Sequence, residues 1–200
     1  MRVREIMTSP AVVLAPELAV KRAAAVLALH GFTGAPVVDG AGHLVGVVNE
    51  QDLLADRFPP DPRTPILERP ARPVADAVSD VMQRHVFVAD PQESVADLVA
   101  VLRSADVRSV PVVENDVVVG VVTYRDLVRA LARDDVLIEA DVRRRLDIFG
   151  GIGQWGVTVR DGAVTLTDDH DDPADRGVAM RVAESVIGVT RCTVVSRQPC

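Results

Sequence analysis

The chain has 200 residues, of which 48% are hydrophobic and only 3% aromatic, so a core must be packed from small aliphatic side chains. Its 22 basic and 29 acidic residues give a net charge of −7, which argues against binding to nucleic-acid phosphates or anionic membranes. The longest apolar stretches, such as Ala23–Leu29, are far shorter than the roughly 20 residues of a membrane-spanning helix.

The cysteine content favours a reducing compartment. The sequence has two cysteines, Cys192 and Cys200, and a structural disulfide is not expected because Cys200 is the last residue. The N-terminal residues Met1–Glu5 lack the apolar run of a secretory signal peptide. We therefore predict a cytoplasmic protein.

Residues 1–133 contain an internal repeat. The early segments of the two units match at one constant offset in residue number. The later segments match at an offset that is one residue shorter. The matching pairs are Val3–Met7 with Val78–Met82, Ala35–Asp39 with Val110–Glu114, Leu44–Val48 with Val118–Val122, and Asp52–Leu53 with Asp126–Leu127. The missing position indicates a shorter hairpin turn in the second unit.

The first unit is expected to fold as strand, helix, strand, strand and helix. Gly31 suits the residue just past a helix, and Gly40–Gly42 suits a turn between strands. The expected elements are strand Ala11–Leu14, helix Ala19–His30, strands Val37–Asp39 and Leu44–Val48, and a helix that begins near Asn49.

The second unit predicts the same order. Ser94–Asp97 has the spacing of a capping box, and Asn115–Asp116 suits a tight hairpin turn. The expected elements are strand Val86–Ala89, helix Ser94–Arg103, strands Val112–Glu114 and Val117–Val122, and a helix that begins at Thr123.

The segment between the units, Arg57–Val74, contains six prolines and predicts a stiff linker without helix or strand. Two repeats, this linker and a different C-terminal pattern give the expected domain organisation. The expected domains are residues 1–56, the linker 57–74, residues 75–133 and residues 134–200.

Residues 134–200 predict a helix, a hairpin, a second helix and a last strand. Asp161–Gly162 favours a type I′ turn, and Asp141 can pair with Arg145 one helical turn later. The expected elements are helix Val136–Phe149, strands Val157–Arg160 and Ala163–Thr167, a helix from Pro173 to about Val186, and strand Val189–Ser196.

The doubled pattern resembles a tandem pair of CBS (cystathionine-β-synthase-like) domains, above all in Gly46–Asp52 and Gly120–Asp126. The resemblance implies a mixed α/β (α+β) fold in which two β-α-β-β-α repeats form a Bateman-type module. It also implies a homodimeric regulator, not an enzyme, that binds an adenine nucleotide (AMP, ADP or ATP) or S-adenosylmethionine and requires no cofactor.

We expect the better ligand site in the second unit. Thr123 stands where a strand becomes a helix, so its hydroxyl and nearby amides suit a phosphate. The resemblance implies that Asp126 accepts hydrogen bonds from ribose hydroxyls. The other expected members are Arg108, Ser109 and Val110 before Pro111, along the adenine edge with Arg108 near phosphate, and Val86 and Phe87 as an apolar wall.

The first unit offers a second candidate site. Asn49 replaces the usual Ser or Thr, Asp52 is retained, and Thr33 and Ala35 flank a small-residue approach for adenine. Thr123–Asp126 and Asn49–Asp52 also have the spacing of capping boxes, so either pair can serve its helix alone. Two glycines within predicted strands, Gly46 and Gly120, indicate close approach to a ligand or to the facing repeat.

The C-terminal order resembles a BON domain, through Val157–Leu166 and Val186–Val189, although Thr167–Asp168 replaces a usual glycine. A CBS pair followed by a BON domain is typical of actinobacterial proteins. The resemblance implies association with phospholipid or with a protein partner, to which a ligand signal would be passed.

The other sequence patterns do not favour metal binding or catalysis. Asp168–Asp172 predicts a solvated acidic loop, because adjacent ligands diverge and no second cluster completes a metal site. Trp155 is either a packing residue or an exposed contact. The four histidines lack paired spacing, and no catalytic motif is present. The alternative function is a ligand-free dimeric scaffold or stress-protection protein.

Overall fold

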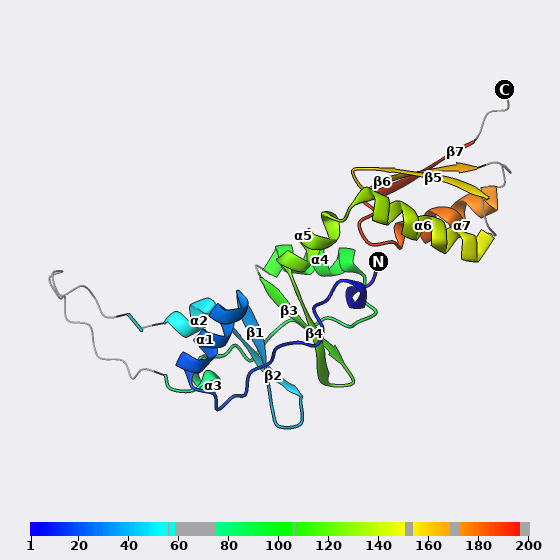
Figure 1. Ribbon diagram of the computed structural model, residues 1–200. Coiled ribbons are helices and arrows are strands. Elements are labelled where there is room, and N and C mark those ends of the chain that lie inside the picture. Colours follow the sequence, from blue (N-terminus) through cyan, green and yellow to red (C-terminus); the bar gives the residue numbers. More distant parts are fainter. Residues whose placement is uncertain (56, 59–74, 106, 151–153, 169–172, 197–200) are drawn as a thin grey trace, which may run out of the picture. The chain divides into compact units, whose positions relative to one another are not determined.

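The computed structural model describes residues 1–55, 57–58, 75–105, 107–150, 154–168 and 173–196 (Figure 1). Contacts divide the chain into two units, Met7–Thr123 and Met1–Ile6 with Tyr124–Cys200. Most of the predicted linker 57–74 lies outside the described residues. Among the described helices, none is long and apolar enough to cross a membrane.

The Met7–Thr123 unit has a helix and a hairpin from each repeat, as predicted. In the first repeat the left-handed Gly31 (φ 63°) follows the first helix. The elements are α1 (Val20–His30), β1 (Gly34–Val38), β2 (Leu44–Asn49), α2 (Glu50–Leu54), α3 (Val78–Val81), α4 (Val95–Ala105), β3 (Ser109–Glu114) and β4 (Val117–Thr123).

The two hairpins have the same irregular register. The pairing of β1 with β2 shifts between Val37 and Val38, and that of β3 with β4 shifts between Val112 and Val113. The predicted turn of the second hairpin is confirmed, because Asn115 and Asp116 have φ values of 50° and 66°.

The first strand predicted for each repeat is wrong in extent. In place of Ala11–Leu14 and Val86–Ala89 there are isolated parallel bridges. The bridges join Leu14 to Val37 and Ala89 to Val112. Continuing either ladder would require the N–H of Pro36 or Pro111, and proline has none. The pairing therefore stops after one residue.

Each repeat sends a leading segment across to the hairpin of the other repeat. We call Met7–Pro10 the first arm and Met82–His85 the second arm. Thr8 N donates to Val121 O (2.9 Å), and the carbonyl of Thr8 accepts from Val121 N (3.0 Å). The equivalent bonds join Gln83 and Val47, at 2.8 and 2.9 Å. The repeats thus exchange their arms.

The exchange explains the two glycines within strands. A Cβ at Gly46 would lie 2.8 Å from Gln83 O and 2.9 Å from Met82 Sδ. A Cβ at Gly120 would lie 2.6 Å from the Sδ of Met7 and 3.0 Å from the carbonyl oxygen of Thr8. Of the two interpretations of these glycines, close approach to the facing repeat is therefore confirmed.

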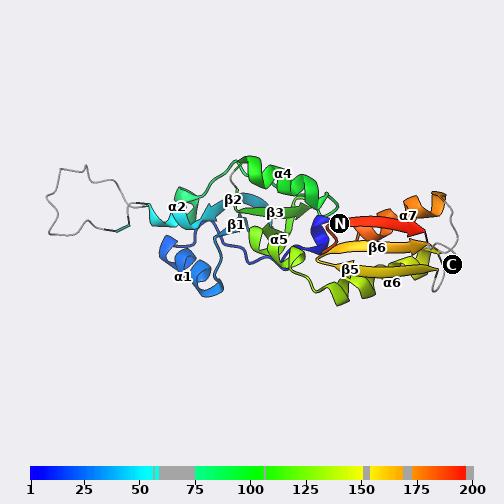
Figure 2. The same cartoon turned by 90° about the horizontal axis from the view of Figure 1, so that it is seen from above.

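The second unit contains a three-stranded sheet with the predicted element order. Strand β6 pairs antiparallel with β5 and parallel with β7, and α6 and α7 cover one face (Figures 1 and 2). The elements are a 3-10 turn (Val3–Glu5), α5 (Tyr124–Leu131), α6 (Asp135–Gly150), β5 (Trp155–Arg160), β6 (Ala163–Asp168), α7 (Pro173–Glu184) and β7 (Arg191–Ser196).

The predicted pairing of Asp141 with Arg145 is wrong. Asp141 instead accepts from Arg133 and, at 2.5 Å, from Arg144. Arg145 donates to Ser185 Oγ (2.7 Å) and to Glu5 (3.3 Å). The hydrogen bond from Arg133 holds the pKa of Asp141 below its usual value, so this stabilisation is lost as pH falls through that lowered pKa.

Asp168 is not the solvated residue that was predicted. It ends β6, is 4% exposed, and accepts from Arg176 Nε at 2.8 Å, since a buried carboxylate requires a partner. The rest of the predicted acidic loop lies outside the described residues. Cys192 is also buried, and burial raises the pKa of its thiol to about 11.

Replacing Gly46 by alanine tests the arm exchange. Gly46→Ala should lower the free energy of unfolding by about 1–3 kcal/mol in urea denaturation, because its methyl group overlaps the second arm. Gly40→Ala is the matched control, since a Cβ there meets nothing within 4 Å. Equal stability of both variants would show that the arm is not tightly held.

A second stability prediction concerns the hairpin of the C-terminal sheet. The Asp135 carboxylate accepts from Asp161 N (2.7 Å) and Gly162 N (2.9 Å). Asp135→Ala should cost about 1–3 kcal/mol because both turn amides lose their acceptor. Unfolding can be followed through the fluorescence of Trp155, the only tryptophan. Asp135→Asn keeps one acceptor, so a loss as large as that of alanine would contradict this account.

Candidate functional site

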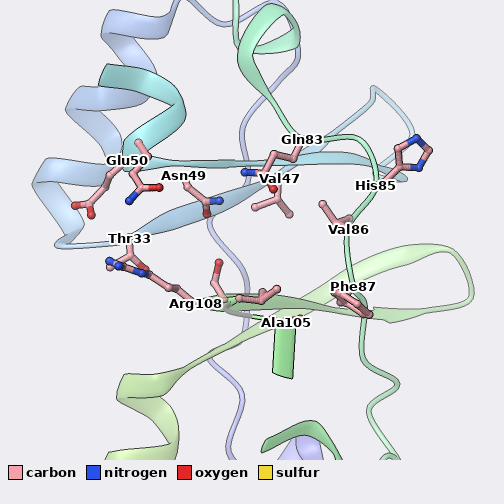
Figure 3. A pocket seen from close by; sticks show the side chains of 13 residues that line it. Thr33, Val47, Asn49, Glu50, Gln83, His85, Val86, Phe87, Ala105 and Arg108 are labelled. Carbon is pink, nitrogen blue, oxygen red and sulfur yellow. The ribbon is translucent and has the colours of Figure 1, made fainter. Parts of the chain in front are cut away.

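A pocket of about 320 Å³ lies in the Met7–Thr123 unit (Figure 3). Its walls come from the hairpin β1–β2, from the second arm and the residues after it, and from the segment between α4 and β3. The lining residues are Thr33, Val47, Asn49, Glu50, Gln51, Gln83, His85, Val86, Phe87, Ala105, Val107, Arg108 and Ser109.

The arm exchange builds this pocket. Because Gln83 is bonded to Val47 through its backbone, the residues that follow the second arm are held beside the first hairpin. Val86 and Phe87 therefore lie across from Asn49, although they belong to the other repeat and are distant from it in the sequence (Figure 3).

Polar groups lie where the two hairpins approach each other. Ser109 is 6% exposed, and its hydroxyl makes no hydrogen bond with the residues that the structure describes. A Cβ at Gly34 would collide with Asn49 Oδ1 and lie 3.3 Å from Ser109 Oγ. The missing side chain at Gly34 thus leaves room for both polar groups, and Ser109 can still bond a ligand.

The other end of the pocket carries the apolar side chains Val86 and Phe87, with His85 beside them. Val47 is buried, whereas Phe87 is 54% exposed. In Figure 3 Val86 and Phe87 lie away from the Asn49 amide, at the opposite end from the Arg108 guanidinium. An exposed aromatic ring beside a polar floor is a surface on which a flat heterocycle can pack.

Asp52 is a helix cap and does not line the pocket. It accepts from Asn49 N at 2.8 Å, which confirms the capping interpretation for this pair. Gln83 Nε2, from the other repeat, lies 3.3 and 3.4 Å from its two carboxylate oxygens. The Asp52 carboxylate therefore lies outside the pocket lining, and the side-chain amide of Gln83 lies against it.

Thr123 and Asp126 do not line this pocket either. Thr123 ends β4 and pairs with Ser109 in the ladder. Asp126 lies in α5, is 3% exposed, and accepts from Arg129 at 2.7 Å. Both residues lie outside the group that the pocket brings together.

The pocket groups the predicted site residues differently from the two sites expected from the sequence. Four of the residues expected beside Thr123 line this pocket together with Asn49 and Thr33. These four are Val86, Phe87, Arg108 and Ser109. Ala35, Val110 and Pro111 are buried in strands β1 and β3 and do not line it.

Sequence reasoning missed several lining residues, among them Val47, Gln83 and His85. The repeat contains a usable signal. A close-packed glycine precedes Val47, and its counterpart in the second repeat, Gly120, precedes Val121. These glycines indicate that another part of the chain packs closely against the strand at that position. They do not identify which segment it is.

The sequence is similar to those of known proteins. The sequence model of the CBS domain matches residues 3–57 and 78–133. The A-adding tRNA nucleotidyltransferase of Aquifex aeolicus is 29% identical over 136 residues, which are 67% of this chain and 15% of that protein. The chain thus spans a small part of this relative. The CBS domain-containing protein YhcV of Bacillus subtilis is 26% identical over 125 residues, 62% of this chain and 81% of YhcV.

Solved structures share the fold. The CBS domain pair of protein MJ0100, in complex with 5′-methylthioadenosine and S-adenosyl-L-methionine, is 26% identical with a TM-score of 0.54, covering 64% of this chain and 94% of that chain. CBSX2 in complex with AMP is also 26% identical, with a TM-score of 0.53 and the same coverage, 64% and 94%.

The capping role of Asp52 predicts a stability effect. Asp52→Ala should lower the free energy of unfolding by about 1–2 kcal/mol, because Asn49 N and the Gln83 amide both lose their acceptor. Glu50→Ala removes a carboxylate from the same helical turn that makes no hydrogen bond with the described residues, so it should change little. Urea denaturation compares the two variants, and equal losses would disprove the capping role.

Proposed function

This chain belongs to the CBS domain family, and on that premise we propose that it is a regulatory module that binds an adenosyl ligand in the pocket beside Asn49. The observation that carries the proposal is the hydroxyl of Ser109, a residue only 6% exposed, which faces a pocket edged by an exposed aromatic ring. Because this hydroxyl has no hydrogen-bond partner among the described residues, it is available to donate to a ligand or to accept from one.

The pocket has the chemical features that an adenosine needs. The adenine ring would pack against Val86 and Phe87, with its polar edge toward Asn49 and Ser109. The ribose hydroxyls would bond Asp52 once the Gln83 amide, which lies 3.3 and 3.4 Å from the two carboxylate oxygens, turned aside. The phosphate or other tail would extend toward Arg108.

The ligands of similar structures support this class of compound. The MJ0100 pair holds 5′-methylthioadenosine and S-adenosyl-L-methionine, and CBSX2 holds AMP. For this chain we propose an adenine nucleotide or S-adenosylmethionine as the regulatory ligand, acting in the cytoplasm.

Thr123 and Asp126 remain a proposed second site. The repeat equivalents of Val86 and Phe87 are Ala11 and Val12, so the arm exchange implies that these small residues would form its apolar wall. The bond from Arg129 to Asp126 would have to open for a ribose to bind there.

We further propose that the module acts as a homodimer and relays ligand binding through residues 134–200 to a protein partner. Leu54 and its repeat equivalent Val128 are 53% and 61% exposed, and such apolar helix residues suit a subunit interface. The αββαβ order of the C-terminal sheet supports its assignment as a BON-like domain. A ligand shifts such a module only through different affinities for two conformations.

The second candidate is a ligand-free dimeric scaffold or stress-protection protein. It is favoured by the fact that Asp52 and Asp126 both already have protein partners. Association of the C-terminal domain with phospholipid belongs to this alternative and would be detected by liposome flotation.

The test is a titration followed by thermal melting with AMP, ADP, ATP, S-adenosylmethionine and 5′-methylthioadenosine. A ligand at 100 times its Kd stabilises the folded chain by about 2.7 kcal/mol. Phe87→Ala should weaken binding roughly tenfold through lost stacking. Val88→Ala is the matched control, because Val88 is also half exposed (52%) and does not line the pocket.

The outcomes separate the candidates. Loss of binding in Phe87→Ala with retention in Asp126→Ala supports the pocket proposed here. The reverse pattern would place the ligand at the second repeat. Failure of all five compounds to shift the melting temperature would favour the scaffold.

A further inference from the structure

The two charged side chains at one end of the pocket have opposite signs. Glu50 is the first residue of α2, and Arg108 immediately precedes β3, so the two come from different repeats. Figure 3 shows the Glu50 carboxylate and the Arg108 guanidinium at the end of the pocket away from Phe87. A ligand whose base packs on Phe87 would direct its tail toward both charges.

Neither charge is neutralised by the part of the chain that the structure describes. Glu50 and Arg108 are exposed, and within those residues neither belongs to an ion pair, with each other or with another side chain. A carboxylate and a guanidinium that line one pocket and remain apart can each bind a separate group of the ligand.

We infer that this end of the pocket recognises the zwitterionic amino-acid tail of an adenosyl amino acid, with Glu50 bound to the ammonium group and Arg108 to the carboxylate. The inference rests on the proposed function. It narrows the ligand class to compounds such as S-adenosylmethionine and S-adenosylhomocysteine.

Charge argues against a polyphosphate in the same place. Arg108 is the one guanidinium among the described residues that line the pocket, and Glu50 would face the phosphates with a like charge. Asp52 adds a second carboxylate behind Gln83. The remaining polar members of the described lining are neutral amides and hydroxyls, apart from His85, which Figure 3 places at the far end.

The arrangement is particular to this pocket. The repeat equivalent of Glu50 is Tyr124, and the repeat equivalent of Arg108 is Thr33. The repeat by itself therefore does not supply the pair of charges. It arises because Glu50 from one repeat and Arg108 from the other line the same pocket.

Calorimetric titration of the full chain with two related compounds tests the inference. S-adenosylhomocysteine and 5′-methylthioadenosine share the adenosyl thioether and differ in the amino-acid tail. The wild type should bind S-adenosylhomocysteine about tenfold more tightly. Glu50→Gln and Arg108→Gln should each lower that affinity about threefold to tenfold and leave 5′-methylthioadenosine unchanged.

Glu114→Gln is the matched control, because Glu114 is exposed and outside the pocket. Equal affinities for the two compounds would overturn the inference while leaving the proposed function intact. Tighter binding of AMP than of S-adenosylhomocysteine, strengthened by Glu50→Gln, would also overturn it in favour of a phosphate site. Failure of the chain to bind S-adenosylhomocysteine and all five compounds of the melting experiment would overturn the proposed function and the inference together.

Discussion

The backbone pairing of each arm with the hairpin of the other repeat is the constraint on which the Met7–Thr123 unit depends. Two pairs of hydrogen bonds, between Thr8 and Val121 and between Gln83 and Val47, hold the arms in place. The arms come so close that a Cβ at Gly46 or Gly120 would overlap them unless the arm shifted. The repeats therefore cannot separate without breaking these hydrogen bonds. The same bonds position the segments of the two repeats that line the pocket.

Exchange also makes the pocket chemically composite. The first hairpin supplies Asn49, whereas the apolar wall and the buried Ser109 come from the second repeat. Under the proposed function, a ligand bound there would contact both repeats at once and would compete with the bond from Gln83 to Asp52. Part of the binding free energy could therefore shift the second arm. The ligand would then have different affinities for two conformations, which a regulatory module requires.

Much of the fold was predictable because its determinants are local. The capping spacing of Asn49–Asp52, the hairpin turns at Asn115–Asp116 and Asp161–Gly162, and the helix end at Gly31 all depend on residues close in sequence. The leading strands were overestimated, because the limiting group is the missing N–H of a proline in a partner strand far along the chain.

The sequence by itself determined the repeat, the family, the element order and several of the side chains that line the pocket, since these depend on spacing and residue type. The tertiary structure alone decided which of them meet. The sequence predicts Val86 and Phe87 in one site with Thr123, but the exchanged arms place them in the pocket that Asn49 lines. Two repeats related by sequence can pack with or without exchange, and only long-range backbone hydrogen bonds distinguish the two arrangements.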